Sequence, residues 1–262
     1  MRDFLTLTLV CVALLAVVQG TTFWIGHRIG RYNVVDVAWG LGLAAVAVVA
    51  AIVGDGDGLR RVLLLLVVGF WGLRLSWHIW RRSRGGGEDP RYAQLLDGAG
   101  TGAVLRKVFV TQGVAQWFIS LPIQVSAVTG PPRGVGRAVM VLGVVTAVGG
   151  VMVESVADRQ LAAFKADPGR RGQVMDSGLW GWSRHPNYFG DACVWIGIYL
   201  IAAAVWPGVL TVLSPAAMVW FLVVATGARL LERHLAERPG YREYQARTSF
   251  FVLRPPRRDS AP

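Results

Sequence analysis

Seven stretches of about 18 or more mainly apolar residues run through the chain, and this feature limits the possible folds more than any other. A helix rises about 1.5 Å per residue, so each stretch can cross the roughly 30 Å hydrocarbon core of a bilayer. In lipid the backbone must satisfy its own hydrogen bonds, which a helix does within one segment. We therefore predict an all-α fold, a polytopic membrane bundle of seven transmembrane helices in a single integral membrane domain, residues 1–262. The predicted spans are residues 4–25, 34–53, 62–80, 108–128, 138–156, 188–205 and 209–231.

Composition agrees with this fold and excludes others. Charged residues make up 16% of the chain, against roughly 25% in soluble domains. The 53% of hydrophobic residues excludes a disordered chain. The two cysteines, Cys11 and Cys193, lie in apolar stretches, so neither a disulfide scaffold nor a zinc cluster is expected. Because His27, His185 and His234 do not show metal-ligand spacing, we predict no metal site.

The first stretch has a second interpretation as a secretory signal peptide, with residues 4–18 as its apolar region and Gln19-Gly20 near the cleavage point. The segment before it holds one basic residue, Arg2, beside Asp3, and the apolar stretch continues to Ile25. These features favour an uncleaved first helix.

The positions of Lys and Arg predict the orientation. With seven spans, the connections on one side hold twenty of the 27 basic residues, the other side holds five, and Arg74 and Arg229 lie within spans. The positive-inside rule places the richer side in the cytoplasm. The N-terminus is then outside, and the C-terminal segment 232–262 is cytoplasmic. This asymmetry accounts for the net charge of +11, and no nucleic-acid-binding motif competes with it, so nucleic acid is not an expected partner.

Several spans contain polar residues, which are costly in lipid and usually face a bundle interior or a cavity. We take four of them as candidate catalytic residues at the substrate end of a site: Asp36, Gln112, Gln116 and Glu154. Gln112 and Gln116 are four residues apart and share a helix face. The alternative is that these groups only hold helices together, through pairs such as Asp36 with Arg74 or through interhelical amide bonds. Glu154 lies near the predicted cytoplasmic boundary, so solvation of its carboxylate by water is a further alternative.

The strongest local signal is the segment Ser177–Asp191, which leads into the sixth predicted span. Pro186 and the glycines break regular helix where hydrogen-bond donors gather. Arg184, His185 and Asn187 offer hydrogen bonds there beside the faces of Trp180, Trp182 and Tyr188, a mixture that suits a planar, phosphorylated ligand. The alternative is an aromatic and arginine belt at the membrane surface, but belts do not usually place Asn and Asp in the span as well.

The segment 229–250 is the second signal. Arg229 and Glu232 are three residues apart and can pair, and Tyr241, Tyr244 and Thr248 fall on one helical face with Arg247 beside them. The alternative is an amphipathic helix that lies on anionic headgroups.

A third segment, Arg81–Tyr92, joins arginines to the run Gly85–Gly87. Its backbone N–H groups could bind phosphate, although the pattern is neither a dinucleotide fingerprint nor a P-loop. A flexible basic loop is the default interpretation.

At these residues the sequence resembles the membrane steroid 5-alpha-reductase C-terminal family, especially its bacterial branch. The resemblance rests on Gly178-Leu-Trp180 followed by Ser183-Arg-His-Pro-Asn-Tyr-Phe-Gly190. It is supported by Asn33, Asp36 and Trp39-Gly40, by Glu88-Asp-Pro-Arg-Tyr92 and by Tyr241-Arg-Glu-Tyr-Gln-Ala-Arg-Thr-Ser249, and extends from about residue 30 to residue 256. The sterol C=C reductases and the isoprenylcysteine carboxyl methyltransferases share the Arg-His-Pro-x-Tyr core.

The resemblance implies a seven-helix bundle that holds NADPH in its cytoplasmic half and admits a lipid-like enone or sterol from the membrane. By position, Asn187 resembles a cofactor ligand, Asp191 the acidic residue after Phe-Gly, and Arg229, Tyr241 and Tyr244 a C-terminal cofactor clamp. This branch typically has Glu where Asp191 stands, and Asp191 matches the sterol-reductase version instead. The Gln and Glu that hold a steroid carbonyl in animal enzymes cannot be placed by motif, so a steroid substrate is unsupported. A bacterial-type plasma membrane is the expected location.

We therefore predict an NADPH-dependent reductase of an activated C=C bond, an oxidoreductase acting on CH-CH groups. Its expected partners are membrane lipids and a lipophilic substrate from the bilayer. Arg171 and Arg184 would offset the phosphate charges of the cofactor. The predicted cofactor ligands are Arg171, Trp182, Arg184, His185, Asn187, Tyr188, Asp191, Arg229, Glu232, Tyr241, Tyr244 and Arg247.

Two alternatives remain open. One is an S-adenosylmethionine-dependent methyltransferase of a lipid or prenyl substrate, whose cofactor carries no phosphates to balance the arginines. The other is a non-enzymatic lipid-binding or transport protein, although the sequence lacks the paired halves that are common in transporters.

Overall fold

The computed structural model describes residues 2–225 and 227–256, and within these ranges the chain forms helices and no strand. The predicted all-α fold is confirmed. The chain divides into two compact units, Met1–Val141 with Ile198–Ser214 and Leu142–Gly197 with Pro215–Pro262. We call them unit 1 and unit 2 and describe each by itself. The expectation that both belong to one membrane domain stays a prediction.

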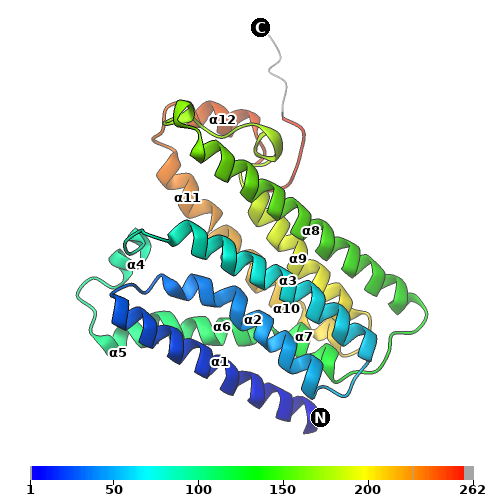
Figure 1. The fold of residues 1–262 in the computed structure, drawn as a ribbon. Coiled ribbons are helices and arrows are strands. Elements are labelled where there is room, and N and C mark those ends of the chain that lie inside the picture. Colours follow the sequence, from blue (N-terminus) through cyan, green and yellow to red (C-terminus); the bar gives the residue numbers. More distant parts are fainter. Residues whose placement is uncertain (1, 226, 257–262) are drawn as a thin grey trace. The chain divides into compact units, whose positions relative to one another are not determined.

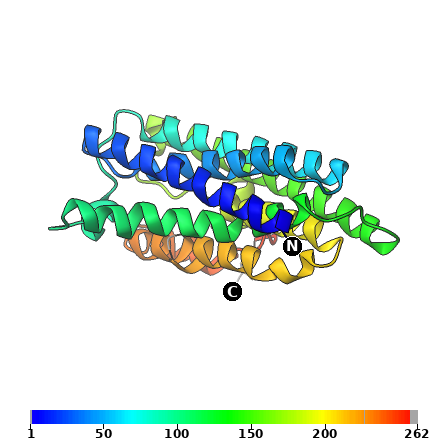
Figure 2. The ribbon, with the colours of Figure 1, turned by 90° about the horizontal axis from the view of Figure 1, so that it is seen from below.

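Unit 1 is built on three long apolar helices, α1 (Arg2–Ile29), α2 (Val34–Val53) and α3 (Gly58–Ser83). They lie side by side, and α2 runs antiparallel to the other two (Figure 1 and Figure 2). Short turns permit this arrangement: residues 30–33 join α1 to α2, and residues 54–57 join α2 to α3. Two short helices follow, α4 (Pro90–Leu95) and α5 (Thr101–Val104), the second leading into the π-helix η1 (Leu105–Val110).

The close approach of α2 and α3 depends on two glycines. A Cβ at Gly40 would overlap the backbone carbonyl of Gly72, and a Cβ at Gly72 would overlap that of Gly40. The Ser76 hydroxyl also donates to the Val37 carbonyl across this contact at 2.7 Å. Small residues at helix crossings in membrane proteins permit such backbone contact.

Replacing Gly72 with alanine is therefore expected to destabilise the protein by about 1–3 kcal/mol, because the added methyl group forces the two backbones apart. Gly69 lies on the same helix with open space at its Cβ position, so Gly69→Ala is the matched control and should stay within about 1 kcal/mol of the wild type. Thermal unfolding in detergent measures both variants. Equal melting temperatures for the two variants would contradict the close contact of α2 and α3.

The predicted span 108–128 is broken. It consists of η1, α6 (Thr111–Ile119) and α7 (Leu121–Ala127), and the helical axis bends by 45° between α6 and α7. Pro122 has no N–H to donate to the carbonyl of Phe118 four residues earlier. The hydroxyl of Ser214 bonds that carbonyl instead, at 2.9 Å. The bend therefore has a local cause and a satisfied backbone.

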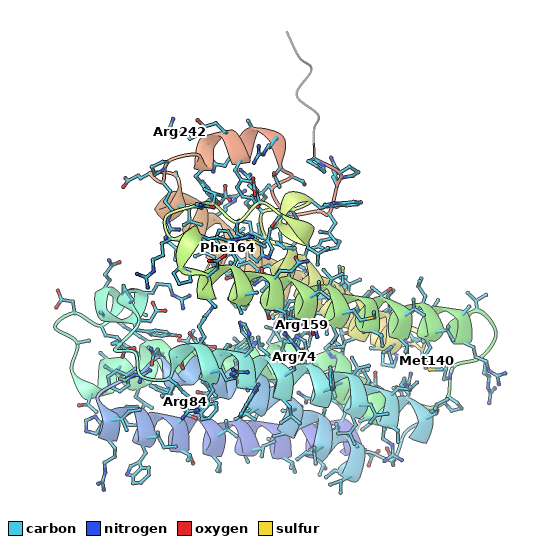
Figure 3. All side chains as sticks on the ribbon, turned by 45° about the horizontal axis from the view of Figure 1, so that its top comes forward. Arg74, Arg84, Met140, Arg159, Phe164 and Arg242 are labelled. Atoms are coloured by element: carbon cyan, nitrogen blue, oxygen red, sulfur yellow. The ribbon has the colours of Figure 1, made fainter. Side chains whose placement is uncertain are left out.

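Unit 2 contains most of α8 (Val135–Ala166) and the first two-thirds of α9 (Pro186–Ala203). Met140 and Phe164 mark opposite ends of α8 in Figure 3. Within unit 2, a Cβ at Gly150 would meet the Gly190 carbonyl, and a Cβ at Gly190 would meet the backbone of Glu154. The two helices thus pack through glycines, and this contact brings polar residues of α8 beside the start of α9.

The remaining elements are short. They are the 3₁₀-helices η2 (Pro168–Arg170), η3 (Gly178–Gly181) and η4 (Gly208–Val212), α10 (Leu213–Trp220), the π-helix η5 (Phe221–Ala225), α11 (Ala228–Leu235) and α12 (Tyr241–Arg247).

Five helical segments among the described residues are long and apolar enough to cross a membrane, or six if the bent pair α6–α7 forms one span. They are Asp3–Ile29, Val34–Val53, Gly58–Ser83, Val135–Ala166 and Gly208–Arg233. The chain is thus compatible with an integral membrane protein. The sixth predicted span, 188–205, corresponds to α9, whose first two turns contain Asn187 and Asp191 and are therefore less apolar. The count of seven and the orientation of the termini stay predictions.

Candidate functional site

The carboxylate of Glu232, on α11, is the centre of a polar cluster in unit 2. Its Oε1 accepts a 2.7 Å hydrogen bond from the Tyr241 hydroxyl and lies 3.1 Å from His185 Nε2. Its Oε2 accepts a 2.6 Å bond from Gln245 Nε2 and pairs with an Arg184 Nη1 at 3.2 Å. Three predicted cofactor ligands, Arg184, His185 and Tyr241, therefore converge on a fourth, Glu232.

Backbone contacts hold the central motif against the C-terminal segment. The Arg184 N–H donates to the Ser249 carbonyl at 2.9 Å, and the Ser183 hydroxyl donates to the Phe251 carbonyl at 2.8 Å. The Tyr244 hydroxyl donates to the Trp180 carbonyl at 2.6 Å. The two segments that the sequence singled out separately thus form one structure.

The two tyrosines of α12 are buried, and their surroundings favour the neutral phenol. Burial, followed by the hydrogen bond to Glu232, raises the pKa of Tyr241. Burial raises the pKa of Tyr244 as well. Both hydroxyls therefore remain proton donors near neutral pH, and both donate to protein acceptors. In this structure the tyrosines of the predicted cofactor clamp support the cluster.

Arg184 is the cation of this cluster. Its side chain is 12% exposed, and its guanidinium carbon lies 5.4 Å from the centre of the Phe250 ring. Its Nε is buried and has no hydrogen-bond partner among the described residues. The Arg184 guanidinium therefore has one N–H donor, at Nε, that does not bond Glu232. The neighbouring His185 ring stacks on Tyr188, with 5.8 Å between the ring centres.

The other predicted cofactor ligands have separate surroundings. Asn187 donates to Asp158 at 3.2 Å, and Asp191 is buried near the start of α9. Arg247 pairs with Asp176. Trp182, Arg171 and Arg229 are exposed. Glu232 therefore forms its ion pair with Arg184. The sequence suggested a local pair with Arg229 instead.

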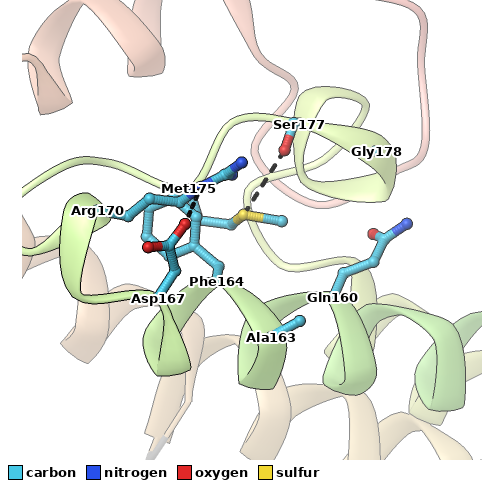
Figure 4. A pocket seen from close by; sticks show the side chains of 8 residues that line it. All are labelled: Gln160, Ala163, Phe164, Asp167, Arg170, Met175, Ser177 and Gly178. Atoms are coloured by element: carbon cyan, nitrogen blue, oxygen red, sulfur yellow. Dashed lines mark hydrogen bonds and ion pairs between the residues drawn. The ribbon is translucent and has the colours of Figure 1, made fainter.

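A hollow of about 280 Å³ opens beside η3 in unit 2 (Figure 4). Phe164 and Met175 give it apolar walls, and the ion pair Asp167–Arg170, at 3.1 Å, lies along one side. The Gln160 side chain, which also lines it, accepts a 3.0 Å bond from the Leu179 N–H. No predicted cofactor ligand lines the hollow.

A second polar cluster lies in unit 1 around Asp36, in the first turn of α2. The Tyr92 hydroxyl donates to Asp36 Oδ1 at 2.6 Å, and an Arg91 Nη2 pairs with Asp36 Oδ2 at 3.4 Å. Arg91 also pairs with Asp89 at 3.0 Å, and the hydrogen bond from Arg91 lowers the pKa of Asp89. Burial, followed by the charge of Asp36, raises the pKa of Tyr92. Tyr92 is therefore a protonated phenol that donates to the side chain of Asp36.

Glu88 fixes the segment that carries Tyr92. Its carboxylate accepts the backbone N–H groups of Tyr32 and Asn33 at 2.5 and 3.0 Å, just before α2 begins. These are N–H groups that the helix itself leaves unpaired. Asn33 in turn donates to the Gly87 carbonyl at 3.2 Å. The loop after α3 is thus tied to the start of α2, which differs from the flexible loop that is the default interpretation of the sequence.

Within unit 1, the candidate catalytic residues Gln112 and Gln116 do not join this cluster. Gln116 is fully buried, donates to the carbonyls of Ala38 and Trp39, and accepts a 2.7 Å bond from Gln19. Its amide therefore joins helices, the alternative that the sequence left open. Gln112 is half-buried on the same helix. Glu154 belongs to unit 2, where it is buried on α8.

Sequence reasoning missed four residues of these clusters: Asp89, Arg91, Tyr92 and Gln245. The first three stand in the segment Glu88–Tyr92, and Gln245 stands between Tyr244 and Arg247. Both segments carried the family resemblance, so the available signal was membership of a motif. Among the His, Cys, Asp and Glu side chains that the structure describes, no three are grouped to hold a metal ion.

Comparison with known proteins places the chain in a family. Residues 22–248 match the DUF1295 family, described as proteins of unknown function, and the chain belongs to this family. It is a steroid 5-alpha-reductase-like membrane family. No curated protein and no solved structure matches the chain.

Proposed function

We propose that the protein is an NADPH-dependent reductase of an activated C=C bond in a lipid-like or steroid-like enone. The observation that carries this proposal is the convergence of Arg184, His185 and Tyr241 on Glu232. It joins the two segments in which the sequence predicts a nucleotide site, and it leaves a buried guanidinium donor, Arg184 Nε, without a hydrogen-bond partner among the described residues. A buried donor of this kind is costly unless a ligand satisfies it.

The donor set in unit 2 fits a phosphorylated dinucleotide. Guanidinium groups suit phosphate because they bind it through two parallel hydrogen bonds. Arg184 would bind a phosphate group, the exposed Arg171 would offset the remaining phosphate charge, and the exposed Trp182 indole offers a flat face for a planar ring. His185, Tyr241, Tyr244 and Glu232 would hold these groups in place. NADPH, when bound, supplies a hydride.

We assign Tyr92, from its contacts within unit 1, the role of donating a hydrogen bond to the enone oxygen. A protonated phenol in partly buried surroundings stabilises charge that develops on an oxygen in the transition state. In the resting structure the Tyr92 hydroxyl donates a 2.6 Å hydrogen bond to Asp36 Oδ1, which orients it, and the enone oxygen would replace Asp36 as the acceptor when substrate binds. The raised pKa of Tyr92 keeps the proton on the phenol at neutral pH.

We further propose the predicted topology of seven spans in a bacterial-type plasma membrane, with the basic connections in the cytoplasm. The excess of Lys and Arg on alternate connections supports this orientation. In this arrangement α9 is the sixth span, and its glycine packing against α8 supports it.

A second candidate, an S-adenosylmethionine-dependent methyltransferase of a lipid, is favoured by one observation. Unit 2 buries three carboxylates, Glu154, Asp158 and Asp191, on α8 and α9. Carboxylates suit the sulfonium cation of that cofactor better than they suit phosphate.

A thermal-shift titration separates the candidates. We expect NADPH to raise the melting temperature of the purified protein, with about 2.7 kcal/mol of stabilisation at a hundredfold excess over Kd, and S-adenosylmethionine to leave it unchanged. Arg184→Gln should weaken NADPH binding roughly tenfold or more, because a charged hydrogen bond is worth about 1.5–3 kcal/mol.

The control is Arg242→Gln, an exposed arginine on α12 (Figure 3) that should bind NADPH like the wild type. Stabilisation by S-adenosylmethionine alone would favour the methyltransferase, and stabilisation by neither cofactor would leave lipid binding or transport as the better proposal.

A further inference from the structure

One end of unit 1 carries exposed tryptophans in contact with arginines. We call Trp24, Arg28, Trp77, Trp80, Arg81 and Arg84 the Trp–Arg surface. The Arg84 guanidinium lies 4.4 Å from the centre of the Trp80 ring, and the Arg28 guanidinium lies 5.1 Å from that of Trp24. Trp77 and Trp80 pack against each other at 4.9 Å. Trp24 and Trp77 are each 57% exposed.

These residues lie at the same end of unit 1, although they come from two helices. Trp24 and Arg28 are in the last turns of α1, and Trp77, Trp80 and Arg81 are in the last turns of α3. An Arg31 Nη2 donates to the Ser83 carbonyl at 3.1 Å and so ties the two helix ends together. Figure 3 labels Arg84 just beyond α3.

The arginines at the other end of α3 are used differently. Arg60 is fully buried and bonds the carbonyls of Thr129 and Gly130 at 2.5 and 2.8 Å. Arg61 donates to the carbonyls of Ala51 and Gly54. The guanidinium groups at this end of α3 therefore join loops, whereas Arg28, Arg81 and Arg84 face solvent.

We propose that the Trp–Arg surface binds the headgroups of anionic phospholipids and fixes this end of unit 1 at the phosphate level of an anionic leaflet. Indole rings prefer the interface between hydrocarbon and headgroups, and arginine binds phosphate through paired donors. An arginine over an indole presents its remaining N–H groups outward while the ring covers one face of the cation. Charge complementarity selects an anionic lipid over a zwitterionic one.

The test compares lipids with identical acyl chains on the full-length protein in neutral detergent. Bound phosphatidylglycerol and phosphatidylcholine are counted by native mass spectrometry, and the stabilisation by phosphatidylglycerol and by inorganic phosphate is compared by thermal shift. Each arginine near an anionic surface contributes a factor of about five in affinity. The double variant Arg81→Gln/Arg84→Gln should therefore lower the affinity for phosphatidylglycerol about 25-fold and leave that for phosphatidylcholine unchanged.

Two further variants make the result specific. Arg133→Gln/Arg137→Gln removes the same charge from exposed positions that follow α7 and should keep the affinity within about twofold of the wild type. Arg81→Lys/Arg84→Lys keeps the charge but loses the paired donors, so it should lower the affinity for phosphatidylglycerol, though less than the Gln variant does. Because the Lys variant preserves the surface charge, its affinity for phosphatidylglycerol tests the proposal if the Gln variant melts at a lower temperature without lipid.

The proposal is overturned if both lipids bind equally, if Arg81→Gln/Arg84→Gln and its Lys counterpart bind phosphatidylglycerol like the wild type, or if the two control arginines matter as much. Stabilisation by inorganic phosphate equal to that by phosphatidylglycerol would also overturn it, because the site would then bind a free anion.

Discussion

Replacing Glu232 with alanine is expected to lower the stability of the protein by on the order of 3 kcal/mol and to abolish the binding of NADPH. The carboxylate is 13% exposed and satisfies His185, Tyr241, Gln245 and Arg184 together. Its removal leaves a nearly buried guanidinium without its counter-ion, the situation in which a broken ion pair costs most. In a protein of this size the loss corresponds to a fall of roughly 10 °C in melting temperature.

Glu232→Gln refines this result. A glutamine has the same shape, but its NH₂ group would face the donors of Gln245 and Arg184, so we expect an intermediate loss of stability. Glu237→Ala is the matched control, because Glu237 is an exposed glutamate just beyond α11, and its melting temperature should equal that of the wild type. A Glu232→Ala protein that melts like the control and binds NADPH normally would remove the basis of the proposed nucleotide site.

The second large effect is expected at Tyr92. Tyr92→Phe should lower kcat for reduction of an enone by about 10²–10³-fold, because it removes the donor that stabilises charge on the substrate oxygen. NADPH affinity should not change, since the phenol takes no part in the proposed nucleotide site. Asp36→Asn should lower kcat less, because the hydroxyl keeps an acceptor but loses the carboxylate that orients it.

Two measurements distinguish this role from a structural one. Tyr32→Phe is the control, because the Tyr32 hydroxyl lies in the same region, 3.2 Å from His27 Nδ1, and its loss should leave kcat within about threefold. The pH profile is the other. The pKa of Tyr92 is raised, so the phenol keeps its proton at pH values above the ordinary tyrosine pKa of about 10. At any pH below about 10, deprotonation of Tyr92 should therefore cause no fall in wild-type kcat. Equal kcat for Tyr92→Phe and Tyr32→Phe would exclude Tyr92 as the donor.

The all-helical fold was predictable because its signal is local. Each apolar stretch specifies a helix without reference to any other, and the described residues of each of the seven predicted spans are mainly helical. The bend between α6 and α7 also has a cause that is visible in the sequence, because Pro122 cannot continue the hydrogen-bond ladder of the helix. The marginal apolar character of α9 follows from Asn187 and Asp191, residues that the sequence analysis had assigned to a site within a span.

The candidate site was predictable where a motif concentrated unusual residues. The segments 177–191 and 229–250 were singled out separately, and the structure joins them through Arg184 and Glu232. The identity of the pair was not predictable. Helical spacing offers only the local partner, Arg229, whereas the structure supplies Arg184 from a distant segment. The contact of Tyr92 with Asp36 likewise spans 56 positions, and no local rule relates such residues.

Glu232, Tyr241 and Gln245 all stand within the last tenth or so of the chain, although the motif that they complete begins near residue 177. During synthesis Arg184 and His185 therefore leave the ribosomal exit tunnel well before Glu232, whose carboxylate they contact. A nascent chain that stalls before α11 would display the motif with its cation uncompensated. The proposed nucleotide site would then form only after α11 and α12 have been synthesised, and a truncation before Glu232 should leave a protein that does not bind the nucleotide.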